Sequence, residues 1–220
     1  MICALKSNAV STLNEDDLEK LSHNCALVKF IKGDSLIKQG ILSSNVVYLR
    51  KGIAKIHITG PYYEQITRLV KAPCYLGLPT TFGDKINQYS VTVIDHAEVC
   101  FIDINAFRSL LEKNAHFSYE IMLELCRNEL TIFHKCANRT QKQVRGNIAD
   151  VLLEFADYLY ESDTFTLPLT QAEIGNLVDA SRESVSRVLT EFDQDGIIRI
   201  TGKQIEVINK KSLLMISEKG

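Results

Sequence analysis

Length, composition and charge set the first limits on this chain. It has 220 residues, of which 45% are hydrophobic and 24% are charged, the balance of an ordinary globular protein with one large or two modest domains. No apolar run is long enough to span a bilayer, and the first residues lack the layout of a signal peptide, so we expect a cytoplasmic protein with no membrane partner. The formal net charge of −2 excludes a general electrostatic attraction to polyanions.

The cysteines do not form a recognisable metal or disulfide pattern. In a cytoplasmic protein they are expected to be reduced thiols. They contain no C-x-x-C pair, so we expect no zinc or iron–sulfur site and no metal ligands. The cysteines are Cys3, Cys25, Cys74, Cys100, Cys126 and Cys136.

The first half of the chain begins with a short helix and continues as strands. Residues Leu13 to Leu27 are expected to be helical, with Asn14 and Asp17 as a capping pattern. Short strands are expected from Val28 to Ile104, and many short strands with glycine turns predict an antiparallel barrel or double-sheet roll. The expected strands are Val46–Leu49, Ile53–Ile58, Gln65–Val70, Ser90–Ile94 and Glu98–Ile102.

The segment from Ala106 to about Ala137 has almost no helix breakers and predicts one long helix. An apolar stripe runs along it, and two interpretations of this stripe stay open. The helix packs on its own barrel, or its second face packs on a copy of itself. We take the second interpretation and expect dimerisation through Phe117, Ile121, Leu125 and Ile132.

These patterns predict an α+β protein in three parts. Residues 1–104 form a β-roll sensor domain with an N-terminal helix, and residues 105–140 form a dimerisation helix and hinge. Residues 141–220 form the third part, after a hinge near Lys142 to Gly146. It is expected to contain an amphipathic helix over Ile148 to Tyr160 and a short strand over Phe165 to Leu167.

The most informative stretch is Leu169 to Gly202, which has the pattern of a helix-turn-helix followed by a hairpin. Thr170 and Glu173 form a capping box at the start of a first helix. After a turn, Ser181 is a good N-cap for a second helix. The segments Ile197–Ile200 and Ile205–Ile208 then predict a hairpin wing.

The side chains at the start of the second helix suit the major groove of DNA. Arginine forms bidentate hydrogen bonds to guanine, and glutamate accepts from cytosine. The expected base-reading residues are Arg182, Glu183, Ser186 and Arg187, and the expected phosphate contacts are Thr170, Gln171, Ser181 and Lys203. The alternative interpretation is an exposed ion pair between Glu183 and Arg187 on a solvated helix.

In this order, roll, long helix, hinge and winged helix-turn-helix resemble the CRP/FNR family of bacterial transcription regulators. The most specific matches are Ala172–Gly175, Ser181–Arg187, Asp195–Ile198 and Gly202–Lys203, supported by Gly33–Asp34, Gly52, Phe107–Leu111 and Val144–Ala149. The resemblance implies a homodimer reading a roughly palindromic site, with Arg182, Glu183 and Arg187 at the family's base-reading positions and half-sites like TGTGA. Asp179 stands where the family often has glycine.

The effector side departs from the cyclic-nucleotide branch of that family. That branch carries Gly-Glu in a turn and an arginine about ten residues later, whereas here Leu78 follows the glycine and Asn87 or Gln88 replaces the arginine. A buried phosphate without its arginine would be poorly compensated. We therefore expect no cyclic AMP binding of the usual kind. The corresponding effector-pocket residues are Leu76, Gly77, Leu78, Asn87, Gln88 and Tyr89.

Other effectors and other protein classes remain as alternatives. Cys3 and Cys25 are too few and too far apart for the family's iron–sulfur cluster. A haem- or small-ligand-sensing regulator of the same fold is the alternative, with Cys74, His57 and His96 as conceivable haem ligands. A cupin-type barrel enzyme would need clustered histidine and glutamate ligands on its strands. The predicted barrel offers only His57 and His96 and has no H-x-H pair, so we expect no enzyme. The expected partners are double-stranded DNA, a second copy of the chain, RNA polymerase and an unknown small-molecule effector.

Overall fold

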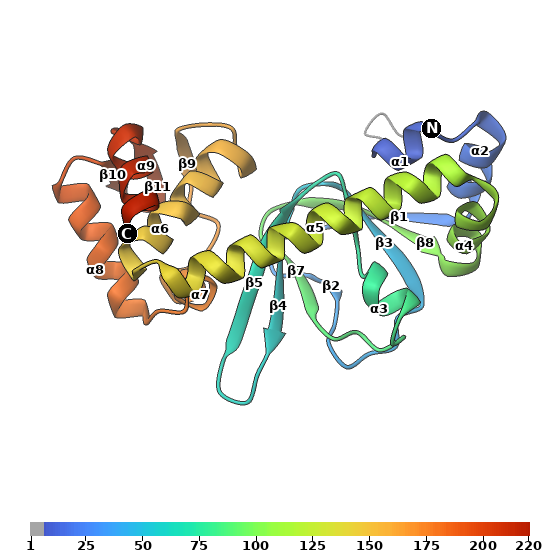
Figure 1. The fold of residues 1–220 in the computed structure, drawn as a ribbon, viewed down its shortest axis with the longest axis horizontal. Coiled ribbons are helices and arrows are strands. Elements are labelled where there is room, and N and C mark those ends of the chain that lie inside the picture. Colours follow the sequence, from blue (N-terminus) through green and yellow to red (C-terminus); the bar gives the residue numbers. More distant parts are fainter. Residues whose placement is uncertain (1–6) are drawn as a thin grey trace. The chain divides into compact units, whose positions relative to one another are not determined.

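A computed structural model describes residues 7–220 (Figure 1). The described residues fall into two compact units, one containing residues up to 61 and 67–131 and the other containing 62–66 and 132–220. The helix α5, Ala115–Gln141, contributes to both units. Among the described residues no helix is long and apolar enough to cross a membrane.

The first unit contains two four-stranded sheets with the strand orders β1-β8-β3-β6 and β2-β7-β4-β5. Their antiparallel pairing confirms the predicted double-sheet roll. The strands are β1 Cys25–Phe30, β2 Ser35–Ile37, β3 Asn45–Lys51, β4 Ile53–Thr59, β5 Glu64–Lys71, β6 Cys74–Leu76, β7 Ser90–Val93 and β8 Ala97–Asp103.

Strand β3 explains how this unit is packed. Val47 and Leu49 lie in a core cluster with residues of β4, β7 and β8, between the two sheets. Val46 and Tyr48 belong to a second cluster, which contains residues of the helices that cover the opposite face of the sheet. Successive side chains of a strand point to opposite faces. Because both faces of β3 are buried at residues 46–49, these four residues form a continuous apolar run.

The predicted N-terminal helix over Leu13 to Leu27 is too long. Two helices, α1 Asn8–Ser11 and α2 Glu15–His23, precede β1. The predicted cap is confirmed, because the Asn14 side chain accepts a hydrogen bond from the Asp17 N–H at 2.8 Å. The prediction failed after His23 because Cys25 to Phe30 pair with β8, a long-range contact that outweighs helical periodicity. Cys3 lies outside the described residues.

The predicted long helix is divided at Asn114. Helix α4, Ile104–Lys113, ends there and α5 begins at the next residue. Asn114 is extended, and its side-chain oxygen accepts a hydrogen bond from the Phe117 N–H at 3.0 Å. An asparagine side chain that satisfies the backbone locally favours a cap over a helix interior, which is the physical reason for the break.

The structure corrects two of the predicted dimerisation residues. Phe117 and Ile121 are 0% and 5% exposed, and both lie in the core cluster of the first unit. The Phe117 ring packs edge-on against Phe107 with centroids 5.4 Å apart. Both side chains are therefore unavailable to a partner, because periodicity shows that a face is apolar but not what it packs against. Leu125 and Ile132 are 38% and 50% exposed.

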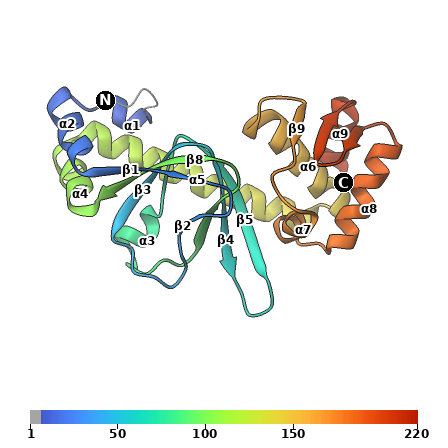
Figure 2. The ribbon, with the colours of Figure 1, turned by 180° about the vertical axis from the view of Figure 1, so that it is seen from behind.

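The second unit confirms the predicted winged helix-turn-helix. Its sheet has the order β10-β11-β9, and Figure 2 shows α9 beside α6, which it contacts. Its elements are α6 Val144–Leu153, the π-helical turn η1 Glu154–Leu159, β9 Thr164–Thr166, α7 Gln171–Val178, α8 Arg182–Gln194, β10 Ile198–Thr201, β11 Gln204–Val207 and α9 Lys210–Lys219.

The predicted hinge is shorter than Lys142 to Gly146. Residues 142–143 separate α5 from α6, and Gly146 lies inside α6. A Cβ atom at Gly146 would lie 2.9 Å from backbone atoms of Gly220. This glycine therefore permits the close contact with the end of the chain after α9, and it is not a flexible joint.

Candidate DNA-binding surface

The two helices of the helix-turn-helix begin as their sequences predict. Thr170 Oγ1 accepts a hydrogen bond from the Glu173 N–H at 3.2 Å, and Glu173 Oε2 accepts one from the Thr170 N–H at 2.9 Å. Ser181 caps α8 by accepting from the Ser184 N–H at 3.1 Å. These side chains satisfy donors that helix starts otherwise leave without partners, so both helix positions are fixed locally.

The turn between the helices is tight. Asp179 adopts the left-handed conformation with φ 58° and ψ 48°, as its position in the turn requires. A Cβ atom on Gly175 would lie 2.4 Å from the Ala180 carbonyl oxygen. Glycine at 175 therefore allows the backbone after α7 to approach the helix closely, and this approach sets the direction in which α8 leaves the turn.

The outer face of α8 carries the predicted base-reading residues together. Apolar side chains of α8, including Val185, Leu189 and Phe192, are buried and hold the helix in the unit. Arg182, Glu183 and Arg187 are exposed, and Ser186 is half-buried. These four residues line one surface hollow, and the other residues that line it are Gln171, Thr190, Glu191 and Gln194.

Three residues of this hollow were missed by the sequence analysis. Thr190, Glu191 and Gln194 follow Arg187 at steps of three, four and seven residues, which places them on its face of the helix. From the sequence, this helical spacing could have indicated that the three residues share a face with Arg187. The alternative interpretation of the helix was an exposed ion pair between Glu183 and Arg187. The structure instead pairs Arg187 with Glu191, at 3.9 Å from Nε to Oε1.

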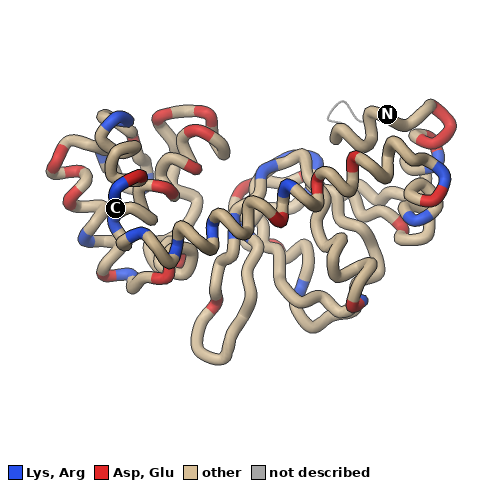
Figure 3. Tube along the Cα trace, viewed as in Figure 1, with Lys and Arg blue, Asp and Glu red and all other residues tan. Residues whose placement is uncertain are grey.

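The predicted phosphate contacts are dispersed. Gln171 lines the hollow, and Lys203 is exposed in the turn between β10 and β11. The hydroxyl groups of Thr170 and Ser181 donate to Glu173 and Ser184 within the helix caps. Figure 3 shows Lys and Arg positions interspersed with Asp and Glu positions along the trace of this unit. Local placement of a few side chains must therefore carry any attraction to phosphate.

The predicted effector-pocket residues lie in two segments that hydrogen bonds join. The Gly77 N–H donates to the Tyr89 hydroxyl at 3.1 Å, and the Thr80 hydroxyl donates to the Asn87 side chain at 3.1 Å. Burial raises the pKa of Tyr89. Leu76 and Leu78 are buried, whereas Gln88 is exposed. The stretch that replaces the family's phosphate-binding turn is thus held by its own side chains.

A polar cluster that the sequence did not predict lies where α5 meets the roll. Glu124 accepts a hydrogen bond from the Tyr75 N–H at 2.9 Å, and Arg68 donates to Asn128 at 2.8 Å. Burial raises the pKa of Glu124, against the lowering effects of that hydrogen bond and of Arg68. Burial also raises the pKa of Cys74 to about 12. Cys74 is therefore a thiol at neutral pH.

The two histidines considered as haem ligands differ in environment. His57 is buried on β4, where its Nε2 lies 2.8 Å from the Thr92 hydroxyl. His96 is exposed in the turn before β8. Across residues 7–220, no three or more His, Cys, Asp or Glu side chains are grouped so that they could hold a metal ion.

Comparisons with known proteins match both units. Residues 27–114 match the family model for the cyclic nucleotide-binding domain, and residues 147–216 match that for the Crp-like helix-turn-helix domain. The chain is 26% identical over 213 residues to the fumarate and nitrate reduction regulatory protein of Vibrio cholerae, covering 94% of this chain and 84% of that protein. It is 28% identical over 192 residues to the cAMP-activated global transcriptional regulator CRP of Escherichia coli, covering 85% of this chain and 91% of that protein.

Solved structures show the same fold. FixK2 from Bradyrhizobium japonicum superposes with a TM-score of 0.78 at 16% identity, covering 87% of this chain and 96% of that one. A protein of the crp/fnr family from Eubacterium rectale superposes with a TM-score of 0.79 at 14% identity, covering 95% of this chain and 97% of that one. Together with the matched family models and relatives, the β-roll, long helix and winged helix-turn-helix identify the chain as a DNA-binding transcription regulator. The chain belongs to the CRP/FNR family of such regulators.

Proposed function

We propose that this regulator acts as a homodimer that reads a roughly palindromic DNA site with α8, under the control of an effector other than cyclic AMP. The observation that carries the proposal is the single hollow on α8 that Arg182, Glu183, Ser186 and Arg187 line together. In a docked helix-turn-helix the N-terminal part of the second helix meets the base edges. RNA polymerase is the downstream partner that such a regulator would contact.

The chemistry of these side chains supports direct base reading. Each arginine offers a planar fork that matches O6 and N7 of guanine, and the Glu183 carboxylate can accept from N4 of cytosine. The side chain of Arg187 is 74% exposed, so it can reach a base without unfolding the helix. A guanine and cytosine pattern of the TGTGA kind suits this set.

The exposed apolar side chains of α5 support a second copy of the chain as the dimer partner. Tyr119, Met122 and Phe133 are 55%, 49% and 62% exposed. With Cys126 and Cys136 they occupy heptad positions, on which two parallel helices pack, and the charged Glu129 stands at the heptad position between Cys126 and Phe133. Two copies related by a two-fold axis would present two α8 helices to successive major grooves, as a palindromic site requires.

The effector site supports a ligand other than cyclic AMP. Leu78 is 4% exposed and lies where a ribose-binding glutamate would be needed. The Asn87 side chain, at one of the two positions where the arginine would stand, accepts a hydrogen bond from the Thr80 hydroxyl. A nucleotide phosphate here would be buried without a cation from either position, which costs free energy.

Fluorescence anisotropy with short labelled duplexes tests the proposal. We expect tight binding to a duplex with two inverted TGTGA half-sites about one helical turn apart. Arg182→Ala and Arg187→Ala should each weaken binding by about 1–3 kcal/mol and relax the preference at one base pair. Lys211→Ala, a charge-matched change on an exposed residue of α9, is the control. Unchanged binding by both arginine variants would remove these residues from the site.

A further inference from the structure

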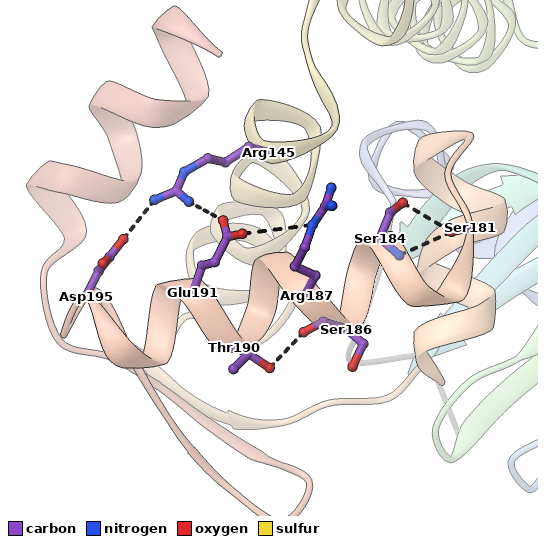
Figure 4. A network of polar contacts seen from close by, with 8 residues as sticks. All are labelled: Arg145, Ser181, Ser184, Ser186, Arg187, Thr190, Glu191 and Asp195. Atoms are coloured by element: carbon purple, nitrogen blue, oxygen red, sulfur yellow. Dashed lines mark hydrogen bonds and ion pairs between the residues drawn. The ribbon is translucent and has the colours of Figure 1, made fainter.

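Arg145, in α6, makes three contacts with α8 and the residue that follows it (Figure 4). Its Nη1 lies 2.6 Å from Oε2 of Glu191, and its Nη2 lies 2.9 Å from Oδ2 of Asp195. Its guanidinium carbon is 4.8 Å from the centre of the Phe192 ring, which is completely buried. Arg145 is therefore held by two carboxylates and an aromatic face, and its own position is well determined.

Glu191 lies between two arginines that differ in the contacts they make with it. One carboxylate oxygen makes the short contact with Arg145, and the other is 3.9 Å from Nε of Arg187. The first distance is that of a strong charge-assisted hydrogen bond, whereas the second is a longer ion pair. Figure 4 shows the terminal nitrogens of Arg187 extending beyond the carboxylate.

This difference matters for base reading. Bidentate recognition of guanine uses two donors of one guanidinium. If Glu191 were not engaged elsewhere, its two oxygens could take both donors of Arg187 in the same fork geometry that guanine requires. A carboxylate four residues away on the same helix face is close enough to do so.

We propose that Arg145 is a positioning residue for Arg187: it holds the Glu191 carboxylate in a short ion pair, so that Glu191 leaves the base-reading donors of Arg187 free. The inference rests on the proposed base reading by Arg187. It assigns a role in sequence specificity to a side chain that lies on α6, outside the helix-turn-helix, and that does not line the hollow.

A purely structural role makes a different prediction. If Arg145 only fastens α6 to α8, its loss disturbs the position of the whole recognition helix, and no change at Glu191 repairs the damage. If Arg145 acts by occupying Glu191, removing the Glu191 charge repairs the loss. The double variant therefore separates the two roles.

The experiment compares Arg145→Gln, Glu191→Gln and the double variant as purified full-length proteins. The readout is the ratio of dissociation constants for the specific duplex and for a duplex changed at the base pair that Arg187→Ala identifies. We expect Arg145→Gln to reduce this ratio about threefold, the scale of an exposed ion pair. The double variant should bring the ratio back up from that of Arg145→Gln to that of Glu191→Gln alone.

Lys142→Ala is the matched control, because it removes a cation whose ion pair, at 2.7 Å, is with Asp150 of α6 and not with α8. It should leave the ratio unchanged. Thermal unfolding of each variant confirms that it folds, and Arg145→Lys, which can hold one carboxylate instead of two, replaces Arg145→Gln if that variant does not.

Failure of the inference is distinguishable from failure of the proposed function. If Arg187→Ala leaves the base preference intact, the base-reading assignment and the inference both fall. If Arg187→Ala relaxes the preference but the double variant stays as impaired as Arg145→Gln, only the inference is overturned and Arg145 is a structural clamp. An Arg145→Gln protein with wild-type preference also overturns it.

Discussion

The carboxylate of Glu124 accepts a hydrogen bond from the backbone N–H of Tyr75 at 2.9 Å, which joins α5 to β6 inside the first unit. The same helix carries the exposed apolar residues Met122 and Cys126 on either side of Glu124. A change in the roll that moved β6 would therefore act directly on the part of α5 that we propose forms the dimer. In the proposed dimer this contact would be a physical route from an effector to the packing of the two α5 helices.

The raised pKa of Glu124 predicts a stability effect with a definite sign. Burial places its folded-state pKa above the unfolded value, so protonation favours folding in acid, and this contribution is lost as the pH rises through the raised pKa. Glu124→Gln keeps an acceptor for the Tyr75 N–H and carries no charge. It should unfold at a higher temperature than the wild type at pH 8, with the difference shrinking toward acidic pH.

Calorimetry at several pH values checks this expectation. Glu112→Gln, the same chemical change at an exposed position of α4, serves as the control and should follow the wild type. A Glu124→Gln protein that melts below the wild type at pH 8 would contradict this expectation. It would show that the hydrogen bond of the ionised carboxylate stabilises the fold by more than burial of its charge destabilises it.

Cross-linking tests the helix pairing in the proposed dimer. Cys126 and Cys136 are exposed, and in a parallel pair of helices each would face its counterpart in the other chain. Mild oxidation with copper phenanthroline and oxygen takes two electrons and two protons from each pair of thiols. It should give a dimer on a non-reducing gel that Cys126→Ser with Cys136→Ser abolishes. An exclusively monomeric product, together with a monomer in sedimentation, would contradict the proposed pairing.

Cyclic AMP should not stabilise this protein. A ligand that binds the folded state at one hundred times its dissociation constant raises the free energy of unfolding by about 2.7 kcal/mol. With Leu78 buried and Asn87 engaged by Thr80, we expect no shift of the unfolding temperature with millimolar cyclic AMP. Thermal scanning measures this directly, and a concentration-dependent rise would restore cyclic AMP as the candidate effector.

The helix-turn-helix was predictable from the sequence because its determinants are local. The capping box at Thr170, the cap at Ser181 and the apolar spacing between them are each encoded within a few residues. The interaction of Arg145 with Glu191 spans 46 residues and has no periodic pattern, so only the folded chain shows it. The same limit explains the wrong prediction for Phe117. Periodicity placed it on an apolar helix face but could not show that this face packs on Phe107.

The first unit was predicted less completely for a related reason. Strand β1 contains Leu27 and Val28, which are 50% and 39% exposed, so its residues lack the alternating pattern of a half-buried strand. Strands β2 and β6 have three residues each, too few for any period to appear. Their pairing with β7 and β3 is set by contacts distant in sequence.

Gly175→Ala should damage both the stability and the DNA binding of the second unit. The added Cβ would lie 2.4 Å from the Ala180 carbonyl oxygen, a backbone atom that cannot move without displacing the turn. A cost of about 1–3 kcal/mol is expected for such overpacking. Because the turn directs α8, affinity for the specific duplex should fall even where the protein remains folded.

Asp179→Gly is the informative companion, because Asp179 already has the left-handed backbone that glycine adopts without strain. Its free energy of unfolding should lie within about 1 kcal/mol of the wild type, because relief of backbone strain and the greater freedom of the unfolded chain oppose each other. It should therefore bind DNA as the wild type does. Urea unfolding and anisotropy measure both variants. If Gly175→Ala binds as well as Asp179→Gly, the close approach at Ala180 does not set the direction of the recognition helix.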